Sequence, residues 1–260
     1  MNVVFGNIRT STSEPARMPE PAPNAELLRA LGRLLRGLSA LFWGLPIALV
    51  ICVQSAKGDW FRPMGVFPAL AATAVLYYGL HLLGNFQSQE RVWISALERA
   101  KVIALVNIAL SPFLFWYNKV PGQTFFAMIV SFLALSGLGY LMALNPVLWR
   151  LAAMLPDETL RQETKFFTTF NRYLLIVCFG LVLFFTSIAW TNAAMIDQVF
   201  DFAISYIPPD RRPLPLLILA DKGAGLWIVL FLVLLPVAMT MALIWKIKEV
   251  IFSSVFGLDH

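Results

Sequence analysis

The chain has 260 residues, of which 59% are hydrophobic and 13% are charged, and its mean hydropathy is +0.73. These values lie far from the averages of water-soluble domains and exclude that class of protein. The net charge is +5, but the basic residues are scattered and no motif that reads RNA or DNA accompanies them, so we expect no nucleic-acid partner. Cys52 and Cys178 both lie in apolar segments, where they imply neither a disulfide framework nor a metal site.

The N-terminal region divides into a polar tail and a basic helix. Residues 1–23 contain four prolines and no hydrophobic periodicity, which predicts a disordered cytoplasmic tail. Residues 24–36 place leucines on one helical face and Arg29, Arg33 and Arg36 on another, which predicts a basic amphipathic helix at a membrane surface. This helix either attracts anionic lipid or is an ordinary basic flank that orients the next helix.

Six uncharged apolar runs follow, and a helix needs around 20 such residues to cross the hydrocarbon core of a bilayer. The first and third runs are short, but each follows an amphipathic segment that can extend it into the interface. We therefore predict an all-α, polytopic helical membrane protein, in which residues 24–260 form a single domain of six transmembrane helices with interfacial amphipathic helices. The runs cover residues 37–53, 66–83, 102–117, 125–144, 173–190 and 226–245.

The basic residues are divided unevenly between the two sides of the predicted membrane. With both termini in the cytoplasm, 14 of the 20 basic residues lie on the cytoplasmic side, as the positive-inside rule favours. In this topology residues 145–167 are a cytoplasmic connector, residues 191–223 an outer loop and residues 246–260 a cytoplasmic tail. We expect a cell membrane as the location, with the bacterial inner membrane favoured.

The eight tryptophans fit the same topology, because an indole prefers the headgroup level, where its ring is buried and its N–H stays hydrated. This distribution supports the number of spans and says nothing about activity. Four tryptophans are expected near the cytoplasmic ends and four near the outer ends: Trp43, Trp93, Trp149 and Trp245, and Trp60, Trp116, Trp190 and Trp227.

The candidate polar residues inside the spans carry no formal charge. No predicted span contains Asp, Glu, Lys or Arg, which usually mark proton relays and ion pathways. His81 could ligate a haem or a metal, but the only other histidine is His260, so we predict no cofactor and interpret His81 as an interfacial or packing residue. Asn107 and Ser111, just before Pro112, are candidates to line a small polar cavity, as is His81; alternatively they hydrogen-bond across a helix contact.

Small residues and prolines suggest how the spans pack. Ser136, Gly139 and Ala143 form a strip on the fourth span, which predicts the close approach of another helix rather than chemistry. Pro112 and Pro236 lie just past the middle of the third and sixth spans, which raises the alternative of an inverted repeat of three spans, as in secondary transporters. Prolines are common in membrane helices, so these two do not establish a repeat.

Charged residues outside the spans gather at two places. On the outer side, residues 195–207 predict an amphipathic helix whose Asp197 and Asp201 face water or, alternatively, bind a cation or serve as an acid/base pair. On the cytoplasmic side, Asn145 and Pro146 predict the start of an interfacial helix, and a second helix then leads into the fifth span. The turn between the two is either a docking site for a partner or a plain solvated connector, and its charged residues are Asp157, Glu158, Arg161 and Glu163.

Three classes of function fit these residues. A non-catalytic integral-membrane subunit or scaffold of a membrane protein complex fits best, with the lipid bilayer and other membrane proteins or further copies of the chain as partners. A small-solute transporter or channel is the alternative, and it would use Asn107, Ser111 and the two prolines. A membrane enzyme acting on a lipid-like substrate is the third class, with Glu158 and Glu163 among the polar groups on offer.

Overall fold

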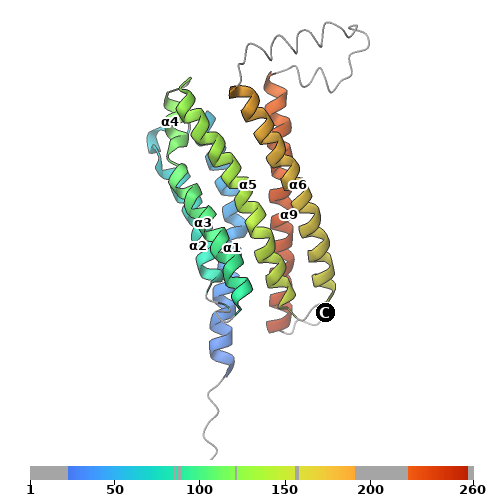
Figure 1. Cartoon of the computed structure of the whole chain (residues 1–260). Helices are drawn as coiled ribbons and strands as arrows, with labels where there is room; N and C mark the ends of the chain where they lie inside the picture. The colour runs from blue at the N-terminus through green and yellow to red at the C-terminus, as the bar shows by residue number, and fades with distance from the viewer. Residues whose placement is uncertain are drawn as a thin grey trace, which may run out of the picture.

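The computed structural model of the protein describes residues 23–84, 86, 90–120, 122–155, 158–190 and 222–256, and these form a helical bundle (Figure 1). Among them, five helical segments are long and apolar enough to cross a membrane, and one apolar helix is shorter. The predicted class, an all-α integral membrane protein, is therefore confirmed. Residues 1–22 of the predicted tail and the predicted outer helix with Asp197 and Asp201 lie outside the described residues.

The helices run alternately along the bundle in opposite directions. α1 runs away from the end where the described chain starts, α2 returns, α3 and α4 run away together, α5 returns, α6 runs away and α9 returns. Figure 1 accordingly shows the start of α1 and the end of α9 at the same end of the bundle. The described helices are α1 (Pro23–Lys57), η1 (Arg62–Met64), α2 (Phe67–Leu83), α3 (Arg91–Leu110), α4 (Phe113–Lys119), α5 (Thr124–Ala153), α6 (Glu158–Trp190) and α9 (Lys222–Phe256).

α2 is the short apolar helix, and its 17 residues are at the lower limit for crossing a bilayer. It lies antiparallel against α1. At one end Leu83 lies beside Gly37, and at the other end Ala69 packs with Cys52. α2 therefore accompanies α1 along the whole predicted first span, residues 37–53.

The two helices approach each other most closely at glycines. A methyl group added at Gly37 would lie 2.3 Å from Leu83 Cδ1 and 2.9 Å from the carbonyl oxygen of Gly79. A methyl group added at Gly79 would lie 2.9 Å from Leu41 Cγ. Neither position has room for a side chain, so the close approach of the backbones depends on both glycines.

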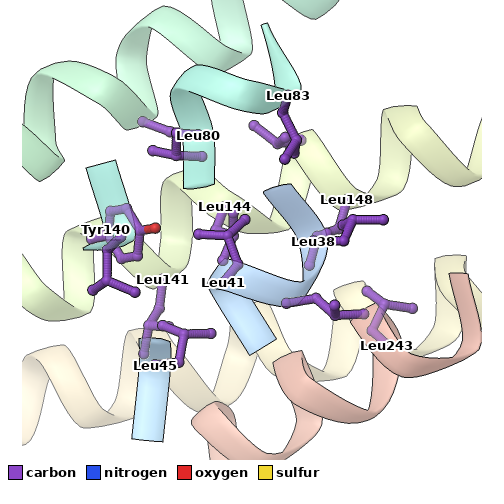
Figure 2. Packing of buried hydrophobic residues seen from close by; sticks show 14 of the residues in the cluster. Leu38, Leu41, Leu45, Leu80, Leu83, Tyr140, Leu141, Leu144, Leu148 and Leu243 are labelled. Atoms are coloured by element: carbon purple, nitrogen blue, oxygen red, sulfur yellow. The ribbon is translucent and has the colours of Figure 1, made fainter. Parts of the chain in front are cut away.

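The main hydrophobic core surrounds α1. Figure 2 shows Leu38, Leu41 and Leu45 of α1 among leucines of α2, α5 and α9. The same core receives Trp93 and Leu97 from one face of α3. α1 thus joins the α2–α3 side of the bundle to the α9 side.

The basic segment at residues 24–36 does not form a separate surface helix. It is the first part of α1, because Leu34 and Leu38 pack into the same core as the span that follows. The predicted cytoplasmic tail, residues 246–260, is likewise not separate from the span before it. Residues 246–256 continue α9, and Ile247 and Ile251 are buried in the core.

The predicted helix start at Asn145 is wrong. Pro146 lies inside α5, which continues to Ala153, and Asn145 is buried rather than capping a helix. The second helix of the predicted connector is present, because α6 runs from Glu158 directly into the fifth apolar run. Both parts of the connector are therefore extensions of transmembrane helices.

Trp93 departs from the predicted pattern of interfacial tryptophans. Trp43, Trp60, Trp116 and Trp245 are between 43% and 81% exposed, whereas Trp93 has no exposed surface. The reason is its place in the buried row of α3, which continues one turn at a time through Leu97, Ala100 and Ala104.

The α1–α2 contact predicts different effects of adding a methyl group at two glycines. We expect Gly37→Ala to lower the free energy of unfolding by about 1–3 kcal/mol, because the new methyl overlaps Leu83 and the backbone of Gly79. Gly139→Ala is the matched control, since nothing lies within 4 Å of its added methyl, and it should have no effect or stabilise α5 slightly.

Unfolding of the purified variants by heat or denaturant in detergent micelles measures the difference. Equal stability of the two variants would contradict the close packing of α1 on α2.

Candidate functional site

A polar contact joins α5, α6 and α9 inside the bundle. The amide Nδ2 of Asn171 donates to Asn145 Oδ1 at 3.0 Å and to Thr240 Oγ1 at 3.1 Å. Thr240 Oγ1 in turn donates to the carbonyl oxygen of Pro236 at 2.8 Å. All three polar side chains are buried. Asn171 therefore uses both of its amide hydrogens to bridge two neighbouring helices.

The buried face of α6 positions Asn171. Thr164, Asn171, Leu175 and Cys178 are buried and recur at spacings of seven, four and three residues, so they lie on one side of the helix. Asn171 lies two residues before the predicted span at residues 173–190. The polar contact therefore lies near the edge of the apolar region, on the side where α6 begins.

Two polar atoms of the Asn145 and Asn171 side chains are available for further hydrogen bonds. Within the described residues, Asn145 Nδ2 and Asn171 Oδ1 have no hydrogen-bond partner, and the same is true of Thr164 Oγ1. Buried polar atoms of this kind commonly bind an ordered water molecule. The cluster can thus bind water or a small uncharged polar group. It contains no general acid or base, so it offers hydrogen bonds and not proton transfer.

A second contact between α6 and α9 depends on a proline. Pro236 has no N–H, which leaves the carbonyl oxygen of Leu232 without its usual helical donor. Cys178 Sγ of α6 lies 3.5 Å from that oxygen, within the distance of a thiol hydrogen bond. Cys178 is therefore more than a small apolar residue, because it compensates for the proline in the neighbouring helix.

The predicted cavity residues Asn107 and Ser111 are 5% and 0% exposed. Ser111 lies at the break between α3 and α4, and its Oγ donates at 3.0 Å to the carbonyl oxygen of Ile108, which Pro112 leaves without a donor. Thr73 Oγ1 of α2 lies 3.4 Å from Ser111 Oγ. Ser111 thus takes part in a contact between helices, while Asn107 Oδ1 is unpartnered among the described residues.

His81 lies apart from these residues. It is exposed near the end of α2, eight residues or about 12 Å along the helix from Thr73. The structure therefore does not bring His81 together with Asn107 and Ser111. In the described parts of the chain, no group of three or more His, Cys, Asp or Glu side chains could hold a metal ion.

The small-residue strip of α5 is only partly covered within the described chain, since Ala143 packs against the main core whereas the position of Gly139 is open. Ser136, Gly139 and Ala143 are half-buried, and a methyl group added at Gly139 would meet nothing within 4 Å. The close contact that this strip was expected to make is found instead at Gly37 and Gly79.

The charged residues at the start of α6 do not form a single cluster. Glu158, Arg161 and Glu163 are exposed, and Asp157 lies outside the described residues. Glu163 forms an ion pair with Lys246 of α9. Residues two apart on a helix point to nearly opposite sides, so Arg161 faces away from this pair.

Comparisons of the chain with protein-family models, with curated proteins and with solved structures found no match. The functional interpretation therefore depends on the residues themselves. Two of these, Asn171 and Thr240, were missed in the sequence. The available signals were the spacing of Asn171 from Leu175 and the place of Thr240 one turn after Pro236.

The hydrogen bonds of Asn171 to Asn145 and Thr240 predict that Asn171→Ala lowers the stability of the protein. We expect the free energy of unfolding to fall by about 0.6–1.7 kcal/mol, as for other hydrogen bonds between membrane helices. Thr168→Val is the matched control on the same helix, because Thr168 binds only carbonyl groups of α6. Thr240→Val should add little in the Asn171→Ala background, since the two residues share one contact.

Unfolding of the four variants in detergent measures these values. Fully additive losses for Asn171→Ala and Thr240→Val would contradict the contact.

Proposed function

We propose that the protein is a non-catalytic integral-membrane subunit or scaffold that binds other membrane proteins through exposed residues on its surface. The observation that carries the proposal is the charged, exposed start of α6, where Glu158 and Arg161 stand clear of the bundle. The interior supports it, because the buried polar residues of the described chain are all Ser, Thr or Asn. Such side chains hold helices together and supply no charged catalytic group.

The length of α6 explains why its start is available to a partner. The helix has 33 residues and is about 50 Å long, whereas the hydrocarbon core of a bilayer is about 30 Å thick. The surplus lies at the charged end. Thr164 is buried and Glu163 forms an ion pair with Lys246, so α6 contacts α9 within two turns of its start.

The open position in the strip of α5 supports lateral association within the membrane. Gly139 leaves open space where a side chain would otherwise lie. Small residues allow a second helix to approach closely, which is the main source of affinity between membrane helices. The partner helix would belong to another membrane protein or to a second copy of this chain.

We also propose that both termini are cytoplasmic, because this orientation places 14 of the 20 basic residues on the cytoplasmic side. A green fluorescent protein fused after His260 should then fluoresce in intact cells, and alkaline phosphatase fused at the same place should be inactive. Active phosphatase with a dark fluorescent fusion would show the opposite orientation.

Partner binding is tested by reversing charges at the start of α6. We expect Glu158→Lys with Arg161→Glu to lose at least one co-purifying membrane protein by tenfold or more, because the docking surface is inverted while net charge is kept. Glu98→Lys with Arg99→Glu is the matched control, since these residues are an exposed acidic and basic pair on α3.

Cross-linking in native membranes, purification and quantitative mass spectrometry measure the partners. The proposal fails if the α6 variant keeps every partner of the parent protein and has the same stability in detergent.

A small-solute transporter is the second candidate, and one observation favours it. Asn145 Nδ2 and Asn171 Oδ1 have no partner among the described residues and lie close to Pro236, and transporters often bind their substrates at such interrupted helices. Transport needs a path for water to these atoms. Leu144 and Ile244, one position before Asn145 and one turn after Thr240, are fully buried, which favours a closed interior.

A further inference from the structure

One face of α1 changes its chemistry along the helix. Arg29, Arg33 and Arg36 are exposed and follow each other at spacings of four and three residues. The same row continues with Trp43, which is 62% exposed, and Ile47. Residues at these spacings lie in one line on a helix. Guanidinium groups, an indole ring and an aliphatic side chain therefore succeed each other toward the middle of the membrane.

A glycine opens a hollow among the three arginines. Arg29, Gly32, Arg33 and Arg36 line a concave surface of about 440 Å³. A methyl group added at Gly32 would meet nothing within 4 Å, so the space at its Cα is open. All four lining residues belong to one face of α1 and the hollow is open on its outer side, so arginine side chains and not an enclosing wall would hold a ligand there.

The packing of α1 keeps the arginines on the outside. Leu34 and Leu38 are buried on the opposite side of the helix, which fixes its rotation. Three guanidinium groups around one hollow then form a site for a phosphate group, since arginine binds phosphate oxygens through two parallel N–H bonds.

Aromatic residues of α1 and α9 mark the membrane interface beside this row. The rings of Phe42 and Trp43 lie 5.2 Å apart, and the rings of Phe42 and Trp245 lie 5.9 Å apart. Lys248 Nζ lies 5.9 Å from the centre of the Phe42 ring. Tryptophan and lysine at this level are typical of the headgroup region of a bilayer.

We propose that this row of α1 binds one anionic phospholipid. Arg29, Arg33 and Arg36 hold its phosphate in the hollow over Gly32, and its acyl chains lie along Trp43 and Ile47. Arg36, Gly32 and Arg29 lie about 10, 16 and 21 Å from Trp43 along the helix. Arg36 is therefore the arginine nearest to a headgroup layer of roughly 5–8 Å, and the other two reach the phosphate through their flexible side chains. Three positive charges around one hollow favour a lipid with net negative charge over a zwitterionic lipid.

Native mass spectrometry of the purified full-length protein with phosphatidylglycerol or phosphatidylcholine tests the proposal. We expect the protein to retain one molecule of phosphatidylglycerol at least tenfold more often than phosphatidylcholine. Gly32→Leu and Arg33→Gln should each reduce this preference at least fivefold. The control, Arg91→Gln, removes an exposed arginine of α3 near the same end of the bundle and should leave it unchanged.

Gly32→Leu is the decisive variant, because it fills the hollow, keeps all three arginines and introduces a residue that favours helix. Undiminished binding by Gly32→Leu would overturn the site and show general attraction to positive charge. Equal retention of the two lipids by the parent protein, or an equal loss for Arg91→Gln and Arg33→Gln, would overturn it as well.

Discussion

Inside a bilayer, a backbone N–H or carbonyl group without a partner in the protein finds no water to bind, and this constraint governs the whole bundle. Helices satisfy it along their length, and at two prolines, Pro112 and Pro236, the structure shows how it is met. Ser111 binds the carbonyl group of Ile108 at the break between α3 and α4, and Cys178 reaches the carbonyl group of Leu232 across the α6–α9 interface. The hydrogen bond of Cys178 also joins two helices, so it contributes to the packing of α6 on α9.

The same constraint sorts residues between the interior and the surface. Glycines bring α1 and α2 together, uncharged amides and hydroxyls join α5, α6 and α9, and the charged groups lie outside the apolar runs. The features able to recognise other molecules are therefore external. Figure 1 shows that the starts of α1 and α6 lie at the same end of the bundle. The arginine row of α1 and the charged start of α6 thus belong to one side of the membrane, so the lipid and the protein partner that we propose would bind on the same side.

The apolar runs were predictable because a bilayer demands about 20 consecutive apolar residues. Four of the runs lie within one described helix each, the run at residues 66–83 begins one residue before α2, and the run at residues 102–117 is divided between α3 and α4. Which face of each helix is buried was not predictable, because the protein core and the lipid both favour apolar side chains. Leu38 is buried and Ile47 is exposed, although both are aliphatic. The Asn171 contact went unrecognised for this reason. Asn145 with Pro146 has the composition of a helix start in water, but neighbouring helices let α5 continue through the proline.

Whether water reaches the side chains of Asn145 and Asn171 distinguishes a protein that binds partners on its surface from one that passes a solute through its interior. Single cysteines at Asn171 and at Arg161, in a background with Cys52→Ala and Cys178→Ser, can be treated with a membrane-impermeant maleimide from each side of sealed vesicles. We predict that the cysteine at Arg161 reacts from one side and that the cysteine at Asn171 reacts from neither. Rapid labelling at Asn171 would contradict the closed interior and favour transport.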